Sequence, residues 1–281
     1  MLQLGIKHKK WTLLMTALWV AVSLSAQREM KTINDGWEFR KPADTEWTSV
    51  NIPHTFNLDA YRQPNYYQGK GLYRRVLTLP EVDPHRRYYL KIDAASKAAE
   101  VTVNGKSAGS HAGGYTAFVV DVTDYIQKEN IIEITVDNGR KDITPISADF
   151  TFWGGIYRDV WLVSTPEQHF RMDNMGSDGV FVSTPEVNGQ RGKIQVKGEV
   201  TNDAETAVTL EVQNQIYSPQ GDLLQTRKQK VKLKAGETRE FGYVSDVIRI
   251  CGRRKHPRFI RSRHNSLIRK PMRSLMKRQI K

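Results

Sequence analysis

The histidines and one pair of opposite charges are the first places in this chain to look for chemistry. His111 lies in "HAGGYTAF", His54 lies between a proline and a threonine, and Arg158 precedes Asp159 in "GGIYRDV". A metal or catalytic site at His111 would need a second His, Cys or carboxylate at ligand spacing, and none stands there. We therefore expect His111 to be a hydrogen-bonded loop residue and His54 to be satisfied locally in a turn. We expect Arg158 and Asp159 to pair with neighbours at a sheet edge, and we predict no catalytic residue and no metal ligand.

The basic stretch "ICGRRKHPRFIRSRH", which starts at Ile250, is the other candidate, because runs of Lys and Arg bind nucleic acid. The chain has 281 residues and a net charge of +13, with 43 Lys and Arg against 30 Asp and Glu. Thirteen of the basic residues and no acidic residue fall between Val247 and Lys281. The charge excess therefore belongs to the tail, and a nucleic-acid-binding tail would show steeply salt-dependent binding.

The first 26 residues have the pattern of a secretory signal. Lys7, Lys9 and Lys10 form a basic start, and a short apolar segment and a small-residue cleavage zone follow. A buried helix or a membrane anchor is the alternative, but polar sequence follows the apolar segment at once. We expect residues 1–26 to be removed, and the protein to be exported to a periplasm or the extracellular space with no membrane contact after cleavage. Export argues against a nucleic-acid partner.

Short segments with alternating apolar residues and frequent turn residues predict an all-β body. Examples are "YYLKID" from Tyr88 and "IIEITVDN" from Ile131. Asn104-Gly105 predicts a two-residue hairpin turn, because both central residues of that turn take positive φ. A boundary falls at Pro166. Residues 28–166 have the size of a jelly-roll sandwich, and 167–248 resemble an immunoglobulin-like sandwich with about five of its usual seven strands.

Six motifs, taken together, resemble the N-terminal part of glycoside hydrolase family 2, the family of β-galactosidases, β-glucuronidases and β-mannosidases. The motifs are "NDGWEF", "WTSVNIPHTFN", "GKGLYRRVLTLP", "AEVTVNGKSAGSHAGGYTAFVVDVTDYI", "NIIEITVDN" and "DFTFWGGIYRDVWL". The resemblance covers nearly all of residues 28–166. It is greatest to the β-galactosidases and implies a sugar-binding jelly roll followed by the immunoglobulin-like sandwich.

The resemblance also implies a contact with the sugar. In the galactosidase branch, an aspartate at the position of Asp149 reaches from the sandwich into the active site, as a ligand of a sugar hydroxyl or of a cation. Asn65, in the loop "NLDAYRQPNYYQGKG", is the second candidate for substrate binding. The alternative for both residues is loop capping through their own backbone. Trp37, Trp47 and Trp161 are expected to fill the core. No cofactor is predicted beyond such a cation.

Enzymes of this family hydrolyse glycosides with retention, using two glutamates about 5 Å apart on a (β/α)8 barrel. The barrel follows the immunoglobulin-like sandwich, and no pair of carboxylates in this chain takes those roles. We therefore expect a fragment truncated before the barrel, which binds a glycan but does not hydrolyse it. A stand-alone lectin-like module is the alternative interpretation.

The family's second sandwich closes with a segment like "LWxPExPxLY" at the position where "ICGRRKHPRFI" stands. Permitted codons for Ile250 to Ile260, read from the third base of the Ile250 codon, encode "LWPPETPPLY". We therefore predict a shift of frame near Arg249 and a disordered, out-of-frame basic tail over residues 249–281. Such a chain would lack the last strands of its second sandwich and would expose Val208, Leu210 and Phe241.

Overall fold

The computed structural model describes residues 28–62, 65–188, 191–218, 220–248 and 262–263. The predicted signal and most of the predicted tail lie outside these residues. The described part is built of strands, with one 3-10 helix η1 (Leu58–Tyr61), so the predicted all-β class is confirmed. No helix in this part is long and apolar enough to cross a bilayer. Two compact units form: 28–165 with 172–178, and 166–171 with the residues from Gly179 onward.

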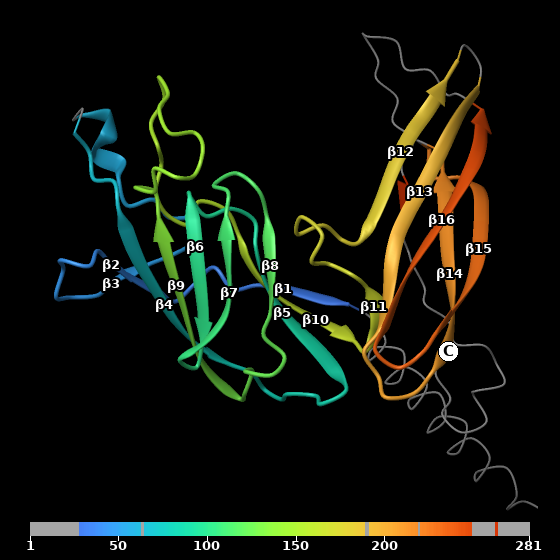
Figure 1. Ribbon diagram of the computed structural model, residues 1–281, viewed down its shortest axis with the longest axis horizontal. Coiled ribbons are helices and arrows are strands. Elements are labelled where there is room, and N and C mark those ends of the chain that lie inside the picture. Colours follow the sequence, from blue (N-terminus) through green and yellow to red (C-terminus); the bar gives the residue numbers. More distant parts are fainter. Residues whose placement is uncertain (1–27, 63–64, 189–190, 219, 249–261, 264–281) are drawn as a thin grey trace, which may run out of the picture. The chain divides into compact units, whose positions relative to one another are not determined.

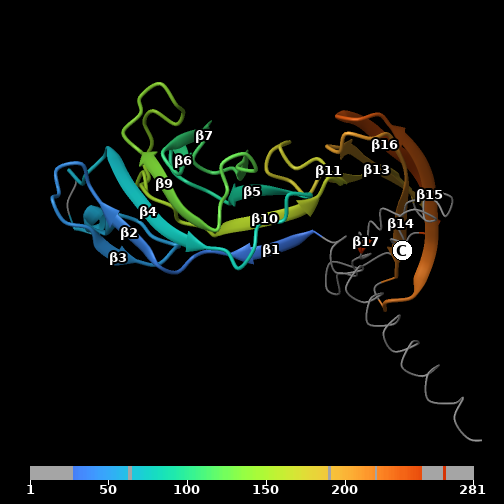
Figure 2. The same cartoon turned by 90° about the horizontal axis from the view of Figure 1, so that it is seen from below.

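The first unit contains two sheets (Figures 1 and 2). The six-stranded sheet has the order β3 (Thr48–Val50), β2 (Trp37–Arg40), β4 (Lys70–Thr78), β9 (Glu129–Asp137), β6 (Ala98–Val103), β7 (Lys106–Ala112). The four-stranded sheet has the order β1 (Glu29–Thr32), β10 (Val160–Pro166), β5 (Arg86–Ile92), β8 (Phe118–Asp121).

The alternation of side chains along the strands builds the core of this unit. Every second residue of β9 is buried, including Ile132, Ile134 and Val136, and β5 buries Leu90 and Ile92 in the same way. Successive side chains of a strand point to opposite faces, so each sheet turns one apolar face toward the other. The shared cluster holds residues of both sheets, which makes the unit a sandwich.

The prediction that three tryptophans fill the core is right for only one of them. Trp37 is fully buried, and its Nε1 donates to Ile33 O over 2.6 Å. Trp47 and Trp161 are half-buried. The Arg74 guanidinium lies 4.2 Å from the centre of the Trp47 ring, and Trp161 Nε1 donates to Asp93 over 2.8 Å. A cation over the face of Trp47 and a carboxylate at the edge of Trp161 give both rings polar partners outside the core.

The predicted hairpin is present between β6 and β7, which pair antiparallel. Asn104 has φ 52° and Gly105 has φ 74°, as a primed turn requires. The segment 172–178, in contrast, packs with the first unit although it follows the predicted boundary at Pro166. Gly176 permits this, because a Cβ on it would lie 2.8 Å from the Ala117 carbonyl carbon.

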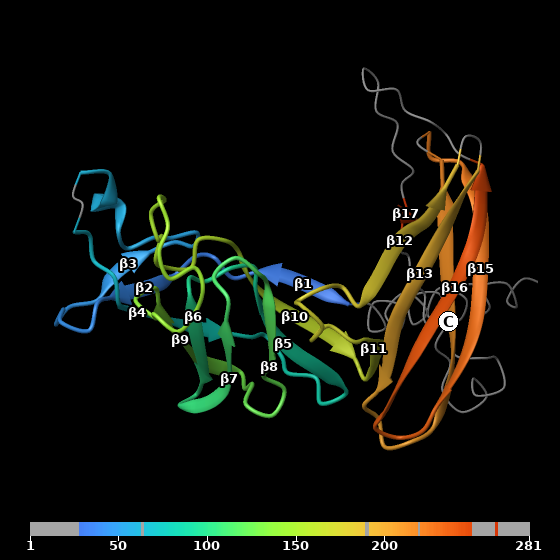
Figure 3. The ribbon, with the colours of Figure 1, turned by 45° about the horizontal axis from the view of Figure 1, so that its top comes forward.

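The second unit also has two sheets (Figure 3). In one sheet β13 (Arg191–Asn202) pairs with β11 (Gln168–Phe170), β12 (Val180–Val187) and β16 (Glu237–Ile248). In the other sheet β14 (Val208–Tyr217) pairs with β15 (Leu223–Leu233) and β17 (Ser262–Arg263). Two residues of the predicted tail thus form a short strand beside Gln215 and Ile216.

The expected exposure of this unit's core is wrong for Leu210 and Phe241. Their exposed fractions are 0% and 3%, and Val208 is half-buried. Leu210 on β14 and Phe241 on β16 belong to one cluster, in which the Phe241 ring lies 5.4 Å from that of Phe170. These side chains pack with residues of both sheets in one cluster.

Candidate functional site

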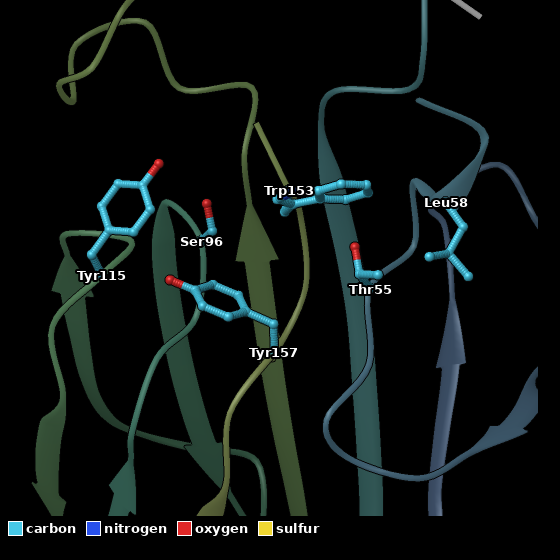
Figure 4. A pocket seen from close by; sticks show the side chains of 6 residues that line it. All are labelled: Thr55, Leu58, Ser96, Tyr115, Trp153 and Tyr157. Carbon is cyan, nitrogen blue, oxygen red and sulfur yellow. The ribbon is translucent and has the colours of Figure 1, made fainter. Parts of the chain in front are cut away.

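The first unit carries a pocket of about 280 Å³ at the ends of its strands (Figure 4). It is lined by Thr55, Leu58, Ser96, Tyr115, Trp153 and Tyr157. These residues come from four separate segments: the one after β3, the one before β6, the connection from β7 to β8, and the one before β10. Three of the six side chains are aromatic, two carry an aliphatic hydroxyl and one, Leu58, is purely aliphatic.

Hydrogen bonds from two other segments fix the backbone of residues 154–156, just before β10. Gly154 O accepts from Phe56 N over 3.1 Å and from Thr55 Oγ1 over 2.8 Å. Gly155 O accepts from Ser96 N over 3.1 Å, and Ile156 O accepts from the His54 backbone N over 2.8 Å. These bonds hold the backbone that carries Trp153 and Tyr157 between the segments that contain Thr55 and Ser96 (Figure 4).

Two fully buried amides complete this support. Asn57 and Asn138 both donate from Nδ2 to Phe152 O over 2.8 Å. Asn57 Oδ1 accepts from Gly154 N over 2.9 Å, and Asn138 Oδ1 accepts from Gly69 N over 2.8 Å. A carboxamide carries both donors and an acceptor, so each side chain satisfies backbone groups that a loop would otherwise bury unpaired. The backbone at Trp153 is therefore preorganised.

The wall formed by Tyr115 and Tyr157 depends on a close backbone approach. Tyr157 Oη donates to Gly114 O, and burial raises the pKa of this phenol, which keeps its proton. A Cβ on Gly114 would lie 3.0 Å from Ser96 Oγ, so the site favours glycine there. Tyr115, with 54% of its surface exposed, stands at the rim.

His54 precedes the lining residue Thr55 and has a hydrogen-bond partner, but this partner is Tyr73 on β4, 19 residues later, and not a residue of its own turn. Its Nδ1 is 2.8 Å from Tyr73 Oη, and its ring packs 4.9 Å from that of Phe39. Burial lowers the pKa of His54 and raises that of Tyr73, so a neutral imidazole meets a protonated phenol. This arrangement supports the fold beneath Gly155, where a Cβ would lie 2.4 Å from His54 O.

Two of the three other residues singled out for chemistry, His111 and Asp159, have a side-chain hydrogen-bond partner. His111 Nε2 lies 3.0 Å from Thr116 Oγ1, and its ring stacks on Phe118, but it belongs to β7 rather than to a loop. Asp159 accepts from Asn34 over 2.9 Å, as the pairing prediction requires. That prediction is wrong for Arg158, whose exposed side chain has no ion pair among the described residues.

The two predicted substrate-binding residues do not line the pocket. Asp149 and Asn65 are both exposed, Asp149 in the connection from β9 to β10 and Asn65 in the one from β3 to β4. Within the described residues, neither side chain makes the hydrogen bond to its own loop that would indicate a capping role. Their assignment as substrate contacts stays a prediction.

Four of the six lining residues lie inside the motifs that resemble the family, but the sequence did not show that they form one pocket. Tyr115, Trp153 and Tyr157 lie inside two of the six motifs, and Thr55 lies inside a third. Ser96 lies in none of them. Its place at the pocket follows from the bridge between Ser96 and Gly155, which joins residues that are far apart in the chain.

Two of the charges near the pocket, on Lys97 and Arg140, have partners, whereas the charge of the exposed Arg158 acts on the Tyr157 phenol. Lys97 follows Ser96 and is only 4% exposed; its Nζ donates to Arg140 O over 3.0 Å and lies 4.6 Å from the centre of the Phe152 ring. Arg140 pairs with Asp142 and lowers the pKa of that carboxyl to about 2. In the described part, no group of three or more His, Cys, Asp or Glu is placed to hold a metal ion.

The stacked sheets define the first unit as a β-sandwich with an aromatic pocket, and the second unit as another β-sandwich. Residues 9–166 match the profile of "Glycosyl hydrolases family 2, sugar binding domain". The chain belongs to glycoside hydrolase family 2, as the six motifs predicted.

Known relatives agree with this membership. A β-glucuronidase of Bacteroides fragilis is 34% identical over 191 residues, which are 66% of this chain and 28% of the relative. The crystal structure of a Bacteroides uniformis β-glucuronidase is 48% identical, with a TM-score of 0.76 over 79% of this chain and 28% of that one. A putative β-galactosidase from Bacteroides fragilis is 29% identical, with a TM-score of 0.77 over 82% of this chain and 37% of that one. The chain thus spans about a third or less of the length of these relatives.

Proposed function

We propose that this chain is the sugar-binding N-terminal region of an exported, retaining exo-glycosidase that removes terminal β-glucuronic acid from glycans. The observation that carries the proposal is the difference in identity between the two kinds of relative. The Bacteroides uniformis β-glucuronidase is 48% identical to the chain and the putative β-galactosidase is 29% identical. Their TM-scores of 0.76 and 0.77 are nearly equal, so the backbone does not favour either sugar.

A β-galactosidase is the second candidate, because the motif "DFTFWGGIYRDVWL" resembles that branch of the family. In either enzyme, Asp149 and Asn65 would contact sugar hydroxyls from the side of the sandwich. A lectin-like module that acts alone is the third candidate, and the aromatic pocket supports it because the chain itself supplies all the lining residues.

The enzymatic proposal is tested on the longer gene product. The coding DNA is read beyond the Arg249 codon, and the chain that continues with Leu-Trp in the shifted frame is expressed and purified. We expect it to hydrolyse 4-nitrophenyl β-glucuronide with a kcat/KM at least ten times that for the β-galactoside. The reverse ratio would favour the second candidate. DNA that encodes no barrel in either frame would favour the third.

The role of Asp149 is tested in the same longer chain. Loss of a charged hydrogen bond costs about 1.5–3 kcal/mol, so Asp149→Asn should lower kcat/KM by about 10- to 100-fold. Asp142→Asn is the matched control, because Asp142 is an exposed carboxylate of the same connection that already pairs with Arg140. Equal activity of the two variants would remove Asp149 from the proposed site. N-terminal sequencing of the exported protein, expected to start at Ala26 or Gln27, tests the signal.

A further inference from the structure

The pocket contains hydroxyl groups and aromatic rings but no charged side chain among the residues that line it. We propose that it binds one neutral hexopyranose ring of a glycan and discriminates against sugars that carry a carboxylate. The inference rests on the proposed function in taking the ligand to be a glycan. It assigns the pocket to a neutral sugar unit, not to the glucuronic acid that the proposed enzyme removes.

The size and the aromatic walls fit a single sugar ring. Ligand pockets usually span about 300–1,000 Å³, and this one, at about 280 Å³, lies just below that range. Trp153 stands between the wall with Thr55 and Leu58 and the wall with Ser96 and Tyr157 (Figure 4). The face of an aromatic ring carries partial negative charge, so it attracts the C–H groups on the face of a pyranose.

Ser96 supplies a polar group that a ligand can reach. Only 4% of the residue is exposed, but it lines the pocket, and its Oγ is not among the buried atoms that lack a partner in the described part. A ligand hydroxyl can therefore form a hydrogen bond with this oxygen. Ser96 is held at this position because its backbone N bonds to Gly155 O.

Two of the lining hydroxyls, those of Thr55 and Tyr157, are oriented to accept. The Thr55 proton is directed at Asn57 Oδ1 and Gly154 O, at 2.9 and 2.8 Å, and the Tyr157 proton is donated to Gly114 O. Both oxygens therefore present lone pairs to the pocket. A sugar hydroxyl can donate to them, whereas a carboxylate has no proton to donate and meets lone pairs with its own negative charge.

No cation among the described lining residues offsets this mismatch. Lys97 is adjacent to Ser96, but its Nζ is buried, donates to Arg140 O and faces the Phe152 ring. The charge of Arg158 acts on the Tyr157 phenol, but Arg158 is exposed and is not a lining residue. An ionised sugar would therefore lose hydration in this pocket without gaining a counter-charge from a lining residue.

The test measures binding to the full chain after removal of the signal, by tryptophan fluorescence and ligand-observed NMR. The probes are methyl β-galactopyranoside, methyl β-glucopyranoside and methyl β-glucuronide at neutral pH. We expect a neutral glycoside to bind at least ten times more tightly than the glucuronide. Ser96→Ala should weaken that binding by about 3- to 10-fold, the effect of one hydrogen bond, and Trp153→Ala should abolish the fluorescence change.

Two further variants keep the test decisive. Trp47→Phe is the control, because Trp47 is half-buried in the same unit and outside the pocket, and it should leave the affinity unchanged. Leu58→Lys adds a cation at a position that is 64% exposed, so it should fold and should raise glucuronide affinity several-fold. Tighter binding of glucuronide by the unmodified chain, no binding of any neutral glycoside, or equal effects of the Trp47 and Trp153 variants would overturn the inference. None of these results bears on which glycoside the longer chain hydrolyses.

Discussion

Asn57 is the buried side chain whose removal should most disturb the support of the pocket. In Asn57→Ala, Gly154 N loses its partner, because Asn57 Oδ1 is the acceptor at 2.9 Å. Phe152 O keeps the bond from Asn138, and Thr55 Oγ1 keeps Gly154 O. One orphaned buried N–H costs about 1–3 kcal/mol and a lost neutral hydrogen bond about 1 kcal/mol. The free energy of unfolding should therefore fall by about 2–4 kcal/mol, a large part of the stability of a typical domain.

Tryptophan fluorescence in urea is the assay for this change. After the predicted signal, every tryptophan of the chain lies at positions 37, 47, 153 or 161, so the emission reports on the first unit only. With an m-value of about 2 kcal/mol/M, the midpoint should fall by about 1–2 M. Asn51→Ala is the matched control, because Asn51 is exposed and should change the midpoint little. Equal midpoints for the two variants would refute the role assigned to the Asn57 amide.

Two more predictions concern the residues beneath the pocket. Gly155→Ala should destabilise the first unit by about 3 kcal/mol or more, because Gly155 has φ +130° and its Cβ would lie 2.4 Å from His54 O. Gly36→Ala, with φ +71° and nothing within 4 Å, should cost only about 1 kcal/mol; equal losses in urea melts would show that the close contact is unimportant. Burial lowers the pKa of His54, so as the pH falls the imidazole is protonated in the unfolded state at a higher pH than in the folded state. The contribution of the neutral imidazole to the free energy of unfolding is therefore fully present above about pH 6.5, the pKa of a free histidine, and it decreases as the pH falls toward the folded pKa. His54→Gln should make the melting midpoint vary less between pH 7.5 and 5. The same pH dependence in the variant and the unmodified chain would contradict a neutral His54 imidazole in the folded state.

The sequence determined the class of the protein because its signals are local. Alternating apolar residues identified the strands, Asn104-Gly105 identified a turn by its backbone preferences, and six motifs identified the family. Each of these signals depends on residues within a short stretch of chain, where side-chain period and turn chemistry are fixed by covalent geometry.

The pocket was decided by tertiary structure, since its members come from four segments. Ser96 and Gly155 are brought together by a backbone bridge, and the hydroxyl protons of Thr55 and Tyr157 are oriented by Gly154 and by Gly114. No local pattern encodes such distant pairings. The same reason explains why Trp47 and Trp161 were expected in the core, and why Leu210 and Phe241 were expected to be exposed. The sequence gives the hydrophobicity of a side chain, but the packing of the sheets determines which other residues cover it.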